Sequence, residues 1–350
     1  LLVSLVLFDG GLNLRFPGGA IKSIVLRISS IRLIISLAAG FLAAHWFAGL
    51  GWSVAGVYSA IVLATGPTVV TPLVRQIRLA SPLSDVLEAE GLILEPIGAV
   101  LALLLLELVV GDLHGWRELL FGLLSRLGGG VLIGSIAGLL LSEGLKRLQS
   151  EPYVGIRLQL TLGVIFLLYG VCEWLLPESG LPASVAAGFV VGQRPSTQAN
   201  ELDKLIRELA QLAITMLFPL LAADVSWGEL SPLGWGGITC VLFLMIIVRP
   251  IAVSIATYGL PLDNKQRLFL GWLAPRGIVT AAVASLFSIR LEQAGVLGAG
   301  KLQGLVFLTI LMTVGIQGLT AQPLAKMLGL LDEDKDLNEA TNSGSIFTES

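Results

Sequence analysis

Cysteine, histidine and charged residues are all scarce in this chain of 350 residues. The two cysteines, Cys172 and Cys240, and the two histidines, His45 and His114, lie far apart in the sequence. This scarcity excludes a disulfide framework and a metal-ligand spacing, and it gives no support to a Ser-His-Asp hydrolase. The net charge of −3 gives no indication of a nucleic-acid partner. We therefore expect no enzyme, no cofactor and no nucleic-acid binding.

The low charge content also argues against a soluble protein. Charged residues make up 13% of the chain, whereas about a quarter of an average soluble domain is charged. Hydrophobic residues make up 55%, and the charges cluster between long apolar blocks. Many of these blocks approach the length of about 20 residues that a helix needs to cross a bilayer. The composition therefore predicts an integral membrane protein surrounded by lipid.

Run length and breaker residues divide the chain into about eleven apolar segments. We expect an all-α polytopic bundle of about 11 helices, most of which span the membrane. The segments are residues 1–9, 31–50, 54–78, 83–110, 118–142, 156–176, 181–193, 205–223, 233–259, 266–290 and 301–328.

Two of these segments are interrupted in the middle. Gly66-Pro67 breaks the segment 54–78, and Ala274-Pro275-Arg276-Gly277 breaks the segment 266–290. Discontinuous helices in two distant parts of a chain are typical of transporters built from inverted repeats. The two halves show no obvious sequence identity, so the repeat is inferred from this organisation alone.

The positive charges between segments alternate along the chain. The loops after even-numbered segments hold only Arg117, Arg290 and Lys301. By the positive-inside rule, the loops after odd-numbered segments are cytoplasmic, and so is the C-terminus. We expect the membrane to be the plasma membrane. Those loops hold Arg15, Lys22, Arg27, Arg32, Arg75, Arg78, Lys146, Arg147, Arg157, Arg194, Lys204, Arg207, Lys265 and Arg267.

The two ends of the sequence suggest a fragment. The chain starts at Leu1 inside an apolar run, without a Met or a basic leader, so we expect helices before it. Residues 1–331 form the predicted membrane domain. The polar, acidic residues 332–350 read as a flexible tail or as a linker to a cytoplasmic domain.

Glu95 is the residue most indicative of function. It lies about 18 Å along the helix axis of the segment 83–110, near the middle of the predicted span, and Pro96 follows it. A carboxylate at that depth is costly and by default indicates a site for a proton or a cation. Because both ligands neutralise the same group, they compete for it. The alternative is a structural carboxylate that is paired inside the bundle.

Two further carboxylates precede Glu95 on the same segment. Glu88 lies about 20° from the helix face of Glu95, nearer the cytoplasmic end, and is a candidate for the entrance to the site. Glu90 is about 140° from Glu95 and deeper than Glu88, so it needs a partner. Arg249, in L-M-I-I-V-R-P, keeps its charge in the membrane and needs a carboxylate. We predict a structural Glu90–Arg249 ion pair.

The breaks themselves are candidate parts of the site. Gly66 and Pro67 permit an unwound backbone, so carbonyl groups and the Thr65 hydroxyl could face a cation. At the second break, beside Pro275, Arg276 could neutralise the negative, carbonyl end of a half-helix. A simple proline kink or a locally paired arginine is the alternative at each break.

Six motifs, taken in order and spacing, resemble the monovalent cation:proton antiporters, the NhaP-type sodium/proton exchangers. They cover nearly the whole chain, although each is weak alone. They are L-F-D-G-G-L-N-L (7–14), A-T-G-P-T (64–68), E-G-L-I-L-E-P (90–96), V-R-P (248–250), G-W-L-A-P-R-G-I-V (271–279) and I-Q-G-L-T (316–320).

The resemblance implies thirteen helices in the whole fold, two crossed discontinuous helices, a dimerisation domain and a core domain that moves like an elevator. This chain would lack the first two helices. Glu95 matches the family's ion- and proton-binding Asp, and Thr65 matches the Thr at the crossing. Glu90 matches the Glu that pairs with a helix Arg, here Arg249.

Three positions depart from the family pattern. Leu94 replaces an Asn, Gly66 replaces the Asp of T-D-P, and Gly91 replaces a Ser that can help to hold the cation. The site therefore offers fewer side-chain oxygens than a typical member, which leaves the choice among Na⁺, K⁺ and Li⁺ open.

We expect a homodimeric secondary transporter that exchanges Na⁺, or another monovalent cation, for H⁺. Three alternatives remain open. One is a potassium-efflux antiporter gated by a cytoplasmic nucleotide-binding domain beyond this chain. Another is a membrane sensor or scaffold that has lost transport. The third, an intramembrane hydrolase, lacks a visible catalytic pair.

Overall fold

The computed structural model describes residues 1–350 except 15–18, 114, 149–153, 194–198, 224–226 and 332–350. The predicted acidic tail and the loop residues Arg15 and Arg194 lie outside the described residues.

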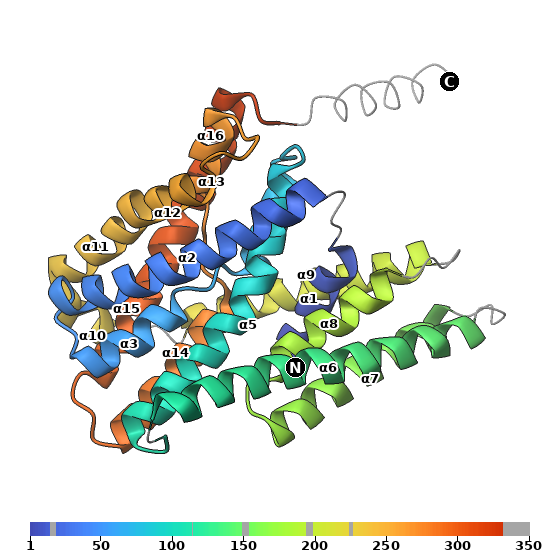
Figure 1. Ribbon diagram of the computed structural model, residues 1–350, viewed down its shortest axis with the longest axis horizontal. Helices are drawn as coiled ribbons and strands as arrows, with labels where there is room; N and C mark the ends of the chain where they lie inside the picture. Colours follow the sequence, from blue (N-terminus) through green and yellow to red (C-terminus); the bar gives the residue numbers. More distant parts are fainter. Residues whose placement is uncertain (15–18, 114, 149–153, 194–198, 224–226, 332–350) are drawn as a thin grey trace.

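Nearly all of the described chain is helical, and each of the eleven predicted segments coincides with one helix or with consecutive helices (Figure 1). The predicted all-α membrane bundle is confirmed. Its elements are α1 (Leu2–Asn13), α2 (Gly19–Trp46), α3 (Trp52–Ile61), α4 (Pro67–Gln76), α5 (Leu83–Val110), α6 (Trp116–Arg147), α7 (Val154–Leu175), α8 (Gly180–Gly192), α9 (Ala199–Ala223), α10 (Trp227–Leu230), η1 (Ser231–Leu233), α11 (Gly234–Phe243), η2 (Leu244–Val248), α12 (Arg249–Ala256), α13 (Asn264–Trp272), α14 (Ile278–Gln293), α15 (Ala299–Met312), η3 (Thr313–Gln317) and α16 (Gly318–Leu328).

Among the described residues, six helical stretches are long and apolar enough to cross a membrane. Three of the shorter helices, α1, α3 and α8, are also apolar. The six stretches are Lys22–Trp46, Leu83–Val110, Trp116–Arg147, Gly155–Leu175, Ser231–Ala256 and Ala299–Leu328.

One predicted boundary is wrong. Helix α2 begins at Gly19, not near residue 31, so Lys22, Arg27 and Arg32 are helical residues and not loop residues. Arg32 is 1% exposed inside the bundle. Counting apolar run length ends a segment at its charges, and it cannot register a charge that a distant carboxylate neutralises.

The tally of loop charges changes accordingly. Eight further residues of the tally also belong to helices, and among the described residues of that set Arg78 alone lies outside a helix. The eight are Arg75, Lys146, Arg147, Arg157, Lys204, Arg207, Lys265 and Arg267. The predicted orientation therefore depends on charges within helices and near their ends, and hardly on loop residues.

The buried apolar residues form two groups. One hydrophobic cluster draws on α1, α6, α7, α8 and α9. The other buried residues, in two further clusters, come mainly from α2 to α5 and from α11 to α16. Figure 1 shows α5 running between the two groups, with α6 across its end. Helix α5, which carries the candidate carboxylates, thus lies between these two groups of helices.

Glycines bring α6 and α8 into close contact. Gly130, Gly134 and Gly138 are buried and recur at every fourth position of α6. A Cβ atom on Gly134 would overlap the backbone of Ala183 on α8. Because lipid does not favour one apolar helix face over another, small residues that let backbones approach are the usual means of helix association in membranes.

We predict that Gly134→Leu lowers the free energy of unfolding by about 1–3 kcal/mol, because overpacking forces α6 away from α8. The measurement is thermal unfolding of purified protein in detergent. Gly128→Leu on the same helix is the matched control, since a Cβ atom there meets nothing within 4 Å. Equal unfolding midpoints for the two variants would contradict the close packing.

Candidate ion-binding site at the crossing of two broken helices

The two interrupted segments cross at their breaks. Helix α3 ends at Ile61 and α4 begins at Pro67, while α13 ends at Trp272 and α14 begins at Ile278. The Gly66 amide donates a hydrogen bond to the Pro275 carbonyl, with an N···O distance of 3.2 Å.

The crossing requires glycine at its centre. A Cβ atom on Gly66 would overlap the Gly277 backbone, and one on Gly277 would lie 2.6 Å from the Gly66 Cα atom. In this structure, contact between the two backbones therefore leaves no room for a side chain at residue 66.

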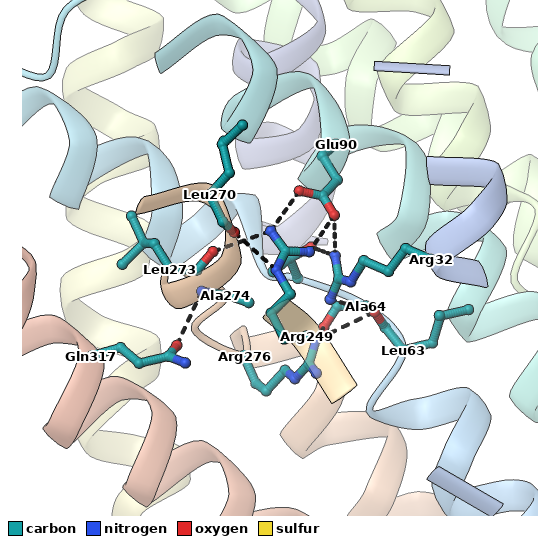
Figure 2. Close-up of polar contacts among 11 residues, drawn as sticks. Arg32, Leu63, Ala64, Glu90, Arg249, Leu270, Leu273, Ala274, Arg276 and Gln317 are labelled. Carbon is teal, nitrogen blue, oxygen red and sulfur yellow. Dashed lines mark hydrogen bonds and ion pairs between the residues drawn. The ribbon is translucent and has the colours of Figure 1, made fainter. Parts of the chain in front are cut away.

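Arg276 donates to the carbonyl end of the first break, whereas the sequence led us to expect it at the carbonyl end of a half-helix of its own break. Its Nη1 atom donates to the carbonyl oxygens of Leu63, at 3.3 Å, and Ala64, at 2.9 Å (Figure 2). Carbonyl groups at the end of a helix carry partial negative charge and have no partner within the helix. The guanidinium thus occupies oxygens that could otherwise face a cation.

Glu90 holds two arginines at once. Arg249 donates from Nη1 to Oε1 at 2.5 Å and from Nη2 to Oε2 at 2.9 Å, and Arg32 donates from Nη1 to Oε1 at 2.5 Å (Figure 2). The exposed fractions are 1% for Glu90 and Arg32 and 4% for Arg249. The structure thus brings Glu90 and Arg249 together and adds Arg32, so the carboxylate is fully engaged.

Arg249 also ties this group to the second broken helix. Its Nε atom donates to the Leu270 carbonyl at 3.1 Å, and its Nη2 atom donates to the Leu273 carbonyl at 3.2 Å. A π-helical turn, η2, directly precedes it. Such turns are frequent at functional sites. Pro250, which lacks an N–H to continue the regular ladder, follows Arg249.

Sequence reasoning missed Arg32 as a member of this group. The missed signal is local, because apolar residues flank Arg32 on both sides in I-S-S-I-R-L-I-I-S-L. An arginine in such surroundings needs a partner as much as Arg249 does.

Thr65 belongs to the Glu90 side of the crossing. Its hydroxyl accepts a hydrogen bond from Arg32 Nη1 at 2.7 Å, and Arg32 Nη2 donates to the Leu63 carbonyl at 3.1 Å. The described contacts of Thr65 thus link the first break to Arg32, and they include no contact with Glu95.

Glu88 is half-buried and lies 3.7 Å from the Arg75 guanidinium. Arg75 lines a pocket between α1, α4 and α9 together with Asp9 and Arg207. Arg75 thus links Glu88 to this charged pocket, and the entrance role of Glu88 stays a prediction.

Glu95 is fully buried, and within the described part of the chain neither of its carboxylate oxygens has a hydrogen-bond partner. A Cβ atom on Gly277 would lie 3.1 Å from its Oε1 atom, so the carboxylate faces the crossing. It lines a small pocket formed by α3, α5 and α14, together with Ile61, Ala64, Ala99, Val279, Thr280 and Val283.

The architecture is that of a secondary transporter. It combines a helical membrane bundle, two crossed discontinuous helices and a carboxylate beside the crossing that has no partner among the described residues. Residues 1–327 match the family model described as "Sodium/hydrogen exchanger, transmembrane". The chain belongs to this family, as the six motifs implied.

Individual relatives support the same assignment. The Na(+)/H(+) antiporter NhaH of Halobacillus dabanensis is 26% identical over 322 residues, which cover 89% of this chain and 77% of the relative. Na(+)/H(+) antiporter 1 of Methanocaldococcus jannaschii is 26% identical over 353 residues, covering 93% of this chain and 81% of the relative.

The solved structure of the sodium proton antiporter MjNhaP1 from M. jannaschii at pH 8 has the same fold. Its TM-score is 0.80 at 23% identity, and the match covers 93% of this chain and 84% of that one.

We predict that Glu90→Gln lowers the free energy of unfolding by about 3–5 kcal/mol, because it leaves two buried arginines without their anion. Denaturation in detergent would measure the loss. Glu143→Gln is the control, because Glu143 is exposed and its ion pair, with neighbouring Lys146 at 3.5 Å, is a surface pair of little energetic weight. If both variants were equally stable, the ion-pair group would not be structural.

Proposed function

We propose that this chain exchanges sodium, or another monovalent cation, for protons across a membrane, with Glu95 binding either ion in turn. One observation carries the proposal, namely that both oxygens of a fully buried carboxylate have no hydrogen-bond partner among the described residues. The relatives named as Na(+)/H(+) antiporters support the choice of ions.

The chemistry follows from the cost of a buried charge. An ionised carboxylate away from water is strongly unfavourable unless it is neutralised. A proton neutralises Glu95 covalently, and a cation neutralises it by coordination, so the two cannot occupy it together. Release of one ion then permits binding of the other, which is the exchange reaction.

The other two carboxylates of α5 are less suited to this role. Glu90 is neutralised by Arg32 and Arg249, so a cation would have to displace a guanidinium. Glu88 is 22% exposed and lies beside Arg75, where water reduces the cost of its charge. We therefore propose a structural role for Glu90, a place for Glu88 on the route from the charged pocket to the site, and ion binding for Glu95.

A single unpaired carboxylate also favours one-for-one exchange. Where the family pattern has an Asp and an Asn beside the site, this chain has Gly66 and Leu94. Since one carboxylate carries one charge, each cation moved in one direction would be matched by one proton moved in the other.

We further propose a homodimer in the plasma membrane with its C-terminal end in the cytoplasm. The alternation of arginines and lysines between successive apolar segments of the sequence supports this orientation through the positive-inside rule. The dimer rests on the family resemblance and on the apolar outer face of α6 and α7, where Leu140 and Leu167 are 70% and 67% exposed.

We predict that Glu95→Gln abolishes cation-driven proton movement in proteoliposomes that contain a pH-sensitive dye, because Gln can neither ionise nor release a proton. In the native protein, competition for one group predicts that the half-saturating Na⁺ concentration rises about tenfold for each unit of pH decrease while protons occupy the site. Glu143→Gln, which changes an exposed carboxylate of α6, should transport normally. Full activity of Glu95→Gln would remove Glu95 from the mechanism.

Electroneutral exchange predicts that the initial rate is independent of membrane potential. A potassium gradient with valinomycin sets the potential, and the rate of Na⁺-driven dye recovery is compared at 0 mV and at about −100 mV, where each net charge moved would be driven by about 2.3 kcal/mol. Equal rates at the two potentials, measured without a protonophore, would support one-for-one exchange. A rate that follows the potential would require a second charge-carrying group.

A further inference from the structure

The pocket at Glu95 contains few oxygen atoms. Of its seven lining residues, only Glu95 and Thr280 carry oxygen in their side chains. Alkali cations are hard ions that bind through several oxygen ligands, in the manner of other hard cations. A carboxylate alone therefore leaves most of the coordination shell to be supplied by other groups or by water.

The oxygen atoms that the sequence led us to expect at the cation site, those near the first break, already accept hydrogen bonds from arginines. The Thr65 hydroxyl accepts from Arg32. The carbonyls of Leu63 and Ala64 accept from Arg276. Each of these oxygens already accepts from a guanidinium, whose positive charge opposes a cation at the same oxygen.

Thr280 is different from the other buried threonines. Its side chain is 3% exposed, and its Oγ1 atom has no hydrogen-bond partner in the part of the chain that the structure describes. Buried hydroxyls are normally paired. The buried hydroxyls of Thr161, Thr257, Thr309 and Thr313 each donate to the carbonyl four residues earlier in the chain.

The break in the second helix explains this difference. Helix α14 begins at Ile278, so Thr280 lies in its first turn. The residue four positions earlier is Arg276, which lies in the break and not in a helix. The Arg276 carbonyl is therefore outside the helix and accepts no hydrogen bond from Thr280, so the hydroxyl remains available to the pocket that it shares with Glu95.

We infer that Thr280 is a cation ligand beside Glu95 and helps to set the selectivity among alkali cations. This inference rests on the proposed exchange function. In the cation-loaded state the Thr280 hydroxyl would contribute a neutral oxygen. In the proton-loaded state the protonated Glu95 could donate to the same oxygen, so one atom serves both states.

The two ligands also join the two halves of the fold. Glu95 lies on α5, beside the first broken helix, and Thr280 lies on α14, directly after the second break. A cation held between them would bridge elements far apart in the sequence at the point where the breaks cross.

The test compares Thr280→Val, which keeps the shape but removes the hydroxyl, with Thr280→Ser, which restores it. Half-saturating concentrations and maximal rates for Na⁺, Li⁺ and K⁺ are measured in proteoliposomes, and Na⁺ binding is measured by calorimetry in detergent. We expect the valine variant to raise the half-saturating Na⁺ concentration about tenfold, as for loss of one buried polar interaction, and to change the Na⁺/Li⁺ ratio. The maximal rate should change less than the half-saturating concentration, and serine should recover both properties.

Thr161→Val is the matched control, because Thr161 is equally buried but its hydroxyl bonds to the Arg157 carbonyl in α7. Native half-saturation and native ion ratios in Thr280→Val would overturn the inference while leaving the proposed exchange intact. An equal loss in Thr280→Ser would assign the effect to packing and also overturn it. If Thr280→Val did not fold, Thr280→Ala would replace it. Absence of exchange in the native protein would instead overturn the proposed function, and this inference with it.

Discussion

The buried ion-pair group at Glu90 is the interaction on which the crossing depends. Glu90 on α5 binds Arg32 on α2 and Arg249 on α12. Through Arg32 the group reaches the carbonyl end of the first break, and through Arg249 it reaches carbonyls at the end of α13. One carboxylate thus connects both broken helices to three surrounding helices. Removing its charge would leave guanidiniums buried without an anion, which is why this group is expected to be structural.

This arrangement assigns two buried carboxylates of one helix to different tasks. Glu90 and Glu95 lie about 140° apart around α5, so they face different neighbours. The arginines gather on the Glu90 side, together with the Thr65 hydroxyl and the carbonyls of the first break. The Glu95 side keeps an apolar pocket with one hydroxyl, Thr280. A carboxylate already neutralised by protein cannot alternate between ions, whereas one without a protein partner can.

Much of the fold could be predicted from the sequence because membrane helices are recognisable as long apolar runs. Apolar runs have to be long enough to span lipid, and breaks at Gly66-Pro67 and Pro275 are visible as interruptions. The predicted start of α2 is wrong because Lys22 and Arg27 interrupt the apolar run, although both residues lie within the helix. The sequence also places Arg32 with the loop charges, because neighbours along the chain do not reveal that Glu90 neutralises it in space.

The sequence by itself determined the helical segments, the two breaks, the depth of Glu95 and the need of Glu90 for a cationic partner. These features depend on hydrophobic length, on the backbone restrictions of glycine and proline, and on the cost of charge in lipid. Only the tertiary structure decided which oxygens remain available to an ion. That outcome depends on contacts between residues far apart in the chain, namely Arg32 with Thr65, Arg276 with Ala64, and Gly66 with the backbone near Gly277. Because each contact engages an oxygen or leaves no room for a side chain, Glu95 and Thr280 are the oxygen-bearing side chains that line the pocket.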